Sequence, residues 1–133
     1  MTPLLLSFLL SALPAAAQPV MPSQDHAARQ AVLRAAAADL EVRLAAEPKA
    51  PELWRRLGHT YQHLGEALKA RDAFLKLVEL KPEDARAWFM LGLVYEKLED
   101  RPAAAAAWEK CLRFTRDEKA AETARRHLED LRP

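Results

Sequence analysis

One pattern of 34 residues occurs twice in succession between residues 51 and 118. Each copy reads Trp-x2-Leu-Gly-x2-Tyr, followed by a Leu, two Ala and an aromatic residue. The matched positions are Trp54 and Trp88, Leu57 and Leu91, Gly58 and Gly92, Tyr61 and Tyr95, Leu64 and Leu98, Ala70 and Ala104, Ala73 and Ala107, and Phe74 and Trp108. A fixed period of this length predicts stacked supersecondary units, each of which contacts its neighbours.

This spacing resembles the tetratricopeptide repeat (TPR), a pair of antiparallel helices. The resemblance implies an all-α fold, in which helical hairpins stack into a right-handed α-solenoid with a capping helix at each end. The composition agrees, because half of the residues are apolar and only three are glycine. The sequence is therefore identified as a small member of this family.

Proline and glycine divide the repeated region into helices. The first repeat spans 51–84, with helices predicted from Pro51 to Leu64 and from Ala67 to Leu80 around a turn at Gly65. The second repeat spans 85–116. Its helices are predicted at 85–98 and, after an N-cap at Asp100, up to residue 114.

The flanking segments are predicted to be helices that close the two ends of the stack. Residues 25–47 form an Ala-rich helix, either an N-terminal cap or the second helix of a degenerate repeat, with an apolar stripe at Val32, Ala36, Leu40 and Leu44. Residues 117–133 form a C-terminal capping helix, whose apolar side carries Ala121, Ala124, Leu128 and Leu131.

The N-terminal segment 1–17 resembles a secretory signal peptide. It has an apolar run from Leu4 to Leu13 and no charged side chain, and it ends in three Ala. This predicts cleavage before Gln18, a short linker at 18–24, and a periplasmic or secreted location. The apolar run is shorter than a membrane span, so membrane contact is expected only if the segment stays uncleaved. No Cys lies near the cleavage site for lipid attachment.

Gly58 and Gly92 lie inside predicted helices, where glycine costs about 1 kcal/mol relative to alanine. We expect both to allow close approach of the second helix of each repeat, through Ala70 and Ala104. Cys111 occupies the repeat position of Leu77 and is expected to be a small buried apolar residue.

The family resemblance implies that the first helix of each repeat lines an inner, concave wall. Carried over by repeat position, the wall residues proposed to contact a partner are Arg55, His59, Gln62, Phe89, Leu93 and Glu96. Phe89 and Leu93 form an apolar patch that either contacts a partner or is covered by flanking helices of the same molecule. The Lys and Asn clamp that some family members use for C-terminal carboxylates is not rebuilt at these positions.

Other chemistries find little support in the sequence. His59 and His63 lie four residues apart, but a zinc site needs further ligands, so no metal or other cofactor is predicted. No nucleophile constellation or phosphate-binding glycine loop is present, so neither catalysis nor a small-molecule substrate is expected. Twenty basic residues balance nineteen acidic ones, which argues against nucleic acid as a partner.

The sequence therefore predicts an exported, non-catalytic adaptor that binds a peptide or a partner helix on its concave wall. The alternative is a structural spacer that forms a weak homodimer through Phe89 and Leu93. Resemblance places such a spacer in an envelope assembly or a cytochrome c maturation assembly. A metal carrier or enzyme built on His59 and His63 is the least supported hypothesis.

Overall fold

A computed structural model describes residues 23–133, and this part of the chain forms six helices and no strand. The predicted signal peptide and most of the predicted linker lie outside the described residues. The helices begin and end within two residues of the predicted ranges: α1 (Gln24–Ala46), α2 (Pro51–His63), α3 (Ala67–Leu80), α4 (Ala85–Lys97), α5 (Arg101–Phe114) and α6 (Glu118–Asp130).

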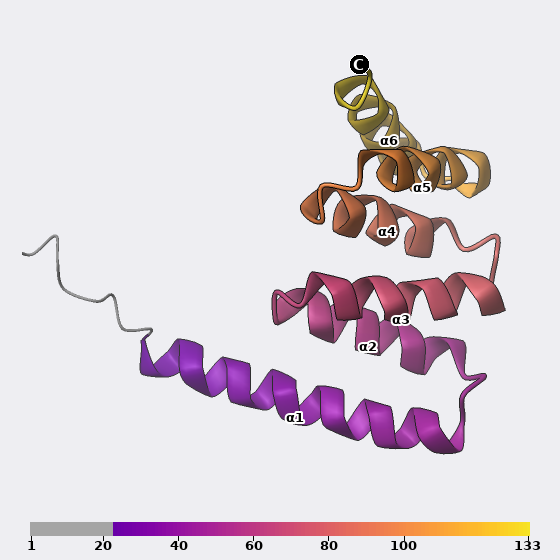
Figure 1. The fold of residues 1–133 in the computed structure, drawn as a ribbon. Coiled ribbons are helices and arrows are strands. Elements are labelled where there is room, and N and C mark those ends of the chain that lie inside the picture. Colours follow the sequence, from indigo (N-terminus) through magenta and orange to yellow (C-terminus); the bar gives the residue numbers. More distant parts are fainter. Residues whose placement is uncertain (1–22) are drawn as a thin grey trace, which may run out of the picture.

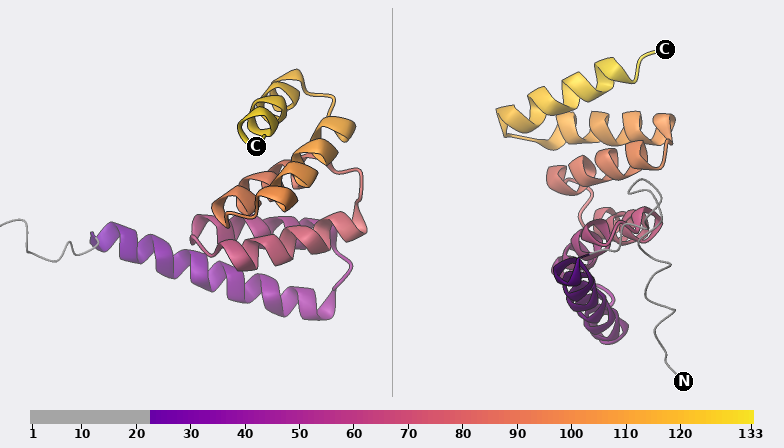
Figure 2. Two further views of the ribbon diagram at one scale, coloured as in Figure 1. Left: turned by 45° about the horizontal axis from the view of Figure 1, so that its top comes forward. Right: turned by 90° about the vertical axis from the view of Figure 1, so that its left-hand side faces the viewer.

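The helices stack in chain order (Figure 1). Helices α2 and α3 form one hairpin and α4 and α5 the next, while α1 packs on α2 and α6 packs on α5. The N-terminal half of α1 extends beyond the hairpins, and α6 crosses the opposite end of the stack (Figure 2). The all-α hairpin stack expected from the sequence is confirmed.

The residues of the repeated pattern build the core. One cluster joins α1, both helices of the first hairpin and the inner side of α4, and includes Leu40, Leu57, Phe74 and Leu91. A second, smaller cluster between the second hairpin and α6 contains Ala104, Trp108, Cys111 and Ala124. Cys111 is fully buried, and burial raises the pKa of its thiol.

The two repeats also share their turns. Trp54 donates a hydrogen bond from its indole to the carbonyl of Pro48, and Trp88 does the same to Pro82, both at 2.8 Å. The hairpin turns use left-handed residues at matched positions, Gly65 with φ 75° and Glu99 with φ 59°. Glycine suits this conformation, and Glu99 adopts it because the turn geometry is fixed by the flanking helices.

Two details of the predicted packing were wrong. Val32 is 68% exposed, and the side of α1 that contacts α2 is instead formed by Ala37, Leu40 and Leu44. A stripe that advances by four residues drifts around a helix of 3.6 residues per turn, so its first member rotates out of the interface.

The glycines make room for aromatic rings rather than for Ala70 and Ala104. A Cβ atom at Gly58 would lie 2.8 Å from the Phe74 ring, and one at Gly92 would lie 2.5 Å from the Trp108 ring. The close approach of helices was expected, but its contact partners were not.

Candidate functional site

A groove of ≈ 520 Å³ lies where α2, α4 and the start of α6 meet, and we call it the α2/α4 groove. Helix α2 contributes His59, and the other lining residues come from α4 and from the α5–α6 turn with the start of α6: Ala85, Arg86, Phe89, Met90, Thr115, Asp117 and Ala120. Apolar side chains of α4 thus lie beside the exposed side chains of Arg86 and Asp117.

The structure brings the six predicted partner-binding residues together only in part. His59 and Phe89 share the α2/α4 groove. Gln62 and Leu93 line a separate small cavity of ≈ 60 Å³ farther along the same two helices. Arg55 and Glu96 are engaged within the molecule, as described next.

Arg55 links the two hairpins. Its guanidinium donates to a carboxylate oxygen of Asp84, and its Nε donates to Glu52 at 3.2 Å. Asp84 is also the N-cap of α4, where its other oxygen accepts from the backbone N–H of Ala87 at 3.1 Å. The hydrogen bond to Asp84 raises the pKa of Arg55 despite partial burial. Burial alone would raise the pKa of Asp84, but hydrogen bonds from Arg55 and Ala87 lower it overall.

Glu96 links α4 to α5 and α6. Its Oε2 accepts a hydrogen bond from the Trp108 indole at 3.1 Å and lies 2.7 Å from Nδ1 of His127. The His127 ring stacks on Trp108, with ring centroids 4.4 Å apart. Glu96 therefore helps to hold α6 in place, a role that the repeat position did not indicate.

Phe89 and Leu93 are half-buried, because they pack against the second core cluster. The Phe89 ring meets the edge of Trp108 at a centroid distance of 5.0 Å. Leu128 and Leu131 of α6 join the same cluster. The apolar patch is thus partly covered inside the molecule, and of its two residues only Phe89 also lines the α2/α4 groove.

His59 is uncharged at neutral pH because its pKa is lowered. The main cause is burial, and the nearby positive charges of Arg55 and Arg86 lower the pKa further. Its ring meets the edge of Phe74 with the centroids 5.3 Å apart. The groove therefore offers a neutral imidazole beside basic groups.

The sequence did not indicate Thr115, Asp117 and Ala120 as groove residues. They come from the α5–α6 turn and from the capping helix, which lie outside the repeated pattern, so no repeat position marks them. Only the tertiary packing of α6 brings them opposite His59.

Within residues 23–133, no three His, Cys, Asp or Glu side chains are grouped closely enough to hold a metal ion. His63 is exposed, and His59 faces Phe74 and the groove. None of the helices in this part of the chain is long and apolar enough to cross a membrane.

Comparison with known proteins agrees with this architecture. Tetratricopeptide repeat models match residues 51–94 and residues 85–118, which together exceed half of the chain. The chain is also 33% identical over 70 residues to the general transcriptional corepressor ssn6 of Schizosaccharomyces pombe. That match covers 51% of this chain but only 6% of the relative, so it concerns a small part of that protein. From the two repeat matches and the paired hairpins, the chain belongs to the tetratricopeptide repeat family.

Proposed function

We propose that the chain is a non-catalytic scaffold that binds a segment of a protein partner in the α2/α4 groove. Tetratricopeptide repeat domains are generally interaction scaffolds without catalytic activity. The observation that carries the proposal is the position of His59 and Phe89, which come from successive repeats and line one groove. Such a groove between helices is a common site for peptides and helices of partners.

The lining residues favour an apolar side chain next to an acidic group. Phe89 and Met90 offer an apolar surface, and the exposed guanidinium of Arg86 can pair with a carboxylate. The neutral imidazole of His59 can accept or donate a hydrogen bond without adding charge. Asp117 opposes acidic groups at the α6 end, so the partner's acidic residue is expected to lie nearest Arg86.

Photo-crosslinking tests the site directly. A photoreactive residue at position 86 should crosslink a partner protein, whereas the same residue at position 126, exposed on α6, should not. The substitution Ala120→Arg should fill the groove and abolish the crosslink, and the matched exposed substitution Arg126→Glu should leave it intact. A partner that crosslinks equally from both positions would place the binding surface elsewhere.

We also propose that the scaffold acts outside the cytoplasm, after removal of residues 1–17. The support is the apolar, uncharged segment that ends in three Ala. Mass spectrometry of the protein purified from its native cells should give an N-terminus at Gln18. An intact N-terminal segment, or recovery from the cytoplasmic fraction, would contradict export.

A homodimer through Phe89 and Leu93 receives less support than a groove-bound partner. Both side chains are already half-buried against Trp108 and α6, which leaves little apolar surface for a second copy.

A further inference from the structure

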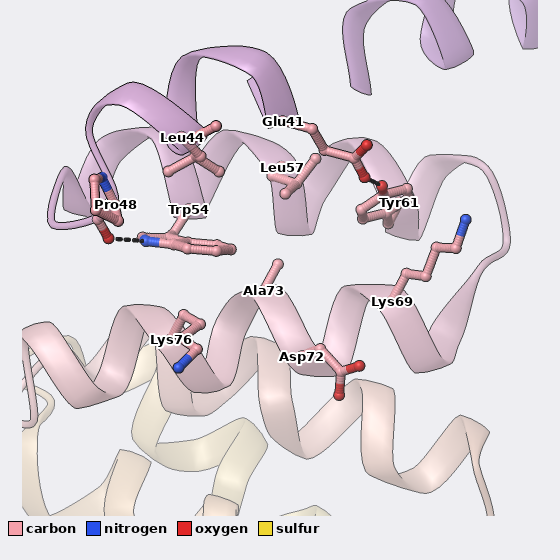
Figure 3. A pocket seen from close by; sticks show the side chains of 11 residues that line it. Glu41, Leu44, Pro48, Trp54, Leu57, Tyr61, Lys69, Asp72, Ala73 and Lys76 are labelled. Atoms are coloured by element: carbon pink, nitrogen blue, oxygen red, sulfur yellow. Dashed lines mark hydrogen bonds between the residues drawn. The ribbon is translucent and has the colours of Figure 1, made fainter. Parts of the chain in front are cut away.

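A second groove of ≈ 520 Å³ lies between α1 and α3 and is floored by α2 (Figure 3); we call it the α1/α3 groove. Its floor is apolar and consists of Leu44, Trp54, Leu57 and Ala73. The Trp54 indole is held by its hydrogen bond to Pro48, so one edge of the floor is fixed. An apolar surface that is open to solvent marks a candidate interaction site.

This groove is separate from the α2/α4 groove. Trp54 and Leu57 lie on one side of α2, and the helix period places His59 on the opposite side. The two grooves share no lining residue. A partner in one groove therefore leaves the other accessible, and the inference made here does not depend on the proposed function.

The second repeat shows what is missing from the α1/α3 groove. Advancing by 34 residues keeps the floor apolar, because its four positions become Val78, Trp88, Leu91 and Ala107. The rim changes, since Glu41, Lys69 and Asp72 correspond to Leu75, Ala103 and Ala106.

In the second repeat the aliphatic residue at this rim is part of the core. Leu75 is half-buried and packs against the cluster that contains Val78 and Leu91. In the first repeat Glu41 turns to the side and accepts a hydrogen bond from the Tyr61 hydroxyl. The α1/α3 groove thus keeps an apolar floor but lacks the aliphatic side chain that covers it in the other copy.

The α3 rim carries two lysines in register. Lys69 and Lys76 are seven residues apart, about 10 Å along the helix, and their side chains are 61% and 56% exposed. Each pairs only with an exposed glutamate three residues away on or beside α3, at 3.4 Å to Glu66 and 3.2 Å to Glu79. Solvent-exposed pairs of this kind are weak, so a partner's carboxylates can replace them.

The walls of the groove decide which conformation the occupant adopts. They are helices, whose backbone groups are already hydrogen-bonded within themselves. An extended segment laid on the apolar floor would leave its own backbone N–H and C=O groups unpaired, which is costly. A helical segment satisfies these groups internally and presents side chains to the floor.

We propose that the α1/α3 groove binds an amphipathic helix of a partner protein. Aliphatic side chains of that helix lie on Trp54 and Leu57, where Leu75 supplies the equivalent contact in the second repeat. Acidic residues seven positions apart face Lys69 and Lys76, and a basic residue on the other flank faces Glu41. The unequal charges of the two rims fix the direction in which the partner helix lies.

The test uses two synthetic peptides of about 18 residues, five helical turns, with the same Leu stripe. The matched peptide carries Glu along the flank that meets α3 and Lys along the other, and its twin has these charges exchanged. Fluorescence anisotropy with the full chain should show micromolar binding of the matched peptide and at least about tenfold weaker binding of the twin.

Two variants locate the binding. Glu41→Leu restores the side chain of the second repeat and should abolish binding of both peptides. Lys69→Glu combined with Lys76→Glu should reverse the preference, so that the twin binds more tightly. Arg86→Glu, in the other groove, should leave both affinities unchanged. Circular dichroism of each variant verifies that it is folded.

Three results would overturn the proposal. One is no binding of the matched peptide at millimolar concentration, and another is equal affinity for both peptides. The third is a chain that dimerises in light scattering and becomes monomeric with Glu41→Leu, because a second copy would then be the occupant. Loss of peptide binding in Arg86→Glu but not in Glu41→Leu would place the helix in the α2/α4 groove and refute the assignment. It would leave the proposed function standing.

Discussion

At the scale of single residues, the closest packing in the molecule joins a glycine to an aromatic ring in each hairpin. Trp108 is fully buried, and its indole is also held by the hydrogen bond to Glu96. Its ring therefore cannot move away if Gly92 gains a side chain. Phe74 is equally buried but makes no such hydrogen bond, since its side chain has no polar group.

Gly92→Ala should destabilise the protein. Its Cβ would lie 2.5 Å from Trp108, and overpacking of this kind costs about 1–3 kcal/mol, which the better helix propensity of alanine offsets by about 1 kcal/mol. Urea denaturation should give a lower free energy of unfolding than for the wild type. Gly58→Ala, with a distance of 2.8 Å to a ring without hydrogen bonds, should cost less. A stabilised Gly92→Ala protein would contradict the close packing.

His59 should make stability depend on pH. Because its pKa is lowered from 6.5 in the folded state, the unfolded chain binds a proton there more readily, and stability falls as pH drops below 6.5. His59→Gln removes this contribution. Thermal melts at pH 7.5 and 5.5 should show a smaller loss of Tm for the variant than for the wild type. An equal loss would mean that His59 titrates normally in the folded protein.

At the scale of elements, α6 is attached to the stack by polar contacts as well as by its apolar side. Ala124 is fully buried in the second core cluster. His127 reaches Glu96 of α4, and Arg101 donates to the carbonyl of Leu131 at 3.0 Å, which satisfies an unpaired group at the end of α6. The helix thus caps the stack and also forms part of the α2/α4 groove.

His127→Ala should loosen α6 without unfolding the hairpins. The change removes the stacking on Trp108 and leaves the Glu96 carboxylate with one partner fewer. Hydrogen exchange should rise several-fold in α6 while α2 and α3 keep their protection. Glu122→Ala, an exposed change on the same helix, serves as the control. Uniformly faster exchange throughout the chain would show that α6 does not open on its own.

At the scale of the whole molecule, the ion pair between Arg55 and Asp84 connects the two hairpins. Its side chains are only 19% and 13% exposed, in contrast to the exposed pair of Arg125 and Glu118 on α6. Burial strengthens such a pair, whereas exposed pairs contribute little. Because Asp84 also caps α4, the same carboxylate fixes the start of the second hairpin relative to the first.

A double-mutant cycle measures this connection. Arg55→Gln with Asp84→Asn, which retains capping ability, should give a coupling energy of about 1–2 kcal/mol at pH 7. The pKa of Asp84 is lowered from 3.8, so the coupling should persist at pH 4 and disappear only as pH falls through the lowered value. The pair Arg125 and Glu118 should show at most about 0.5 kcal/mol. Equal coupling for both pairs would contradict an inter-hairpin role.

The sequence predicted the helices well because local signals mark them. Pro51, Gly65 and Asp100 stop or start helices through backbone geometry and capping, which depend on neighbouring residues only. The candidate site was predicted less completely. Repeat positions identified His59 and Phe89, but they carry no information on the capping helices, so Ala120 and the contact of Glu96 with His127 were missed.

The sequence by itself determined the hairpin, its period and its core residues, because a repeat imposes the same local pattern and the same packing twice. Only the tertiary structure decided which of these side chains remain accessible. The placement of α6 covers part of the Phe89 and Leu93 patch, and Glu41 of α1 leaves the floor around Trp54 open. Exposure depends on the helix that packs alongside, and that helix is not encoded in the residues it covers.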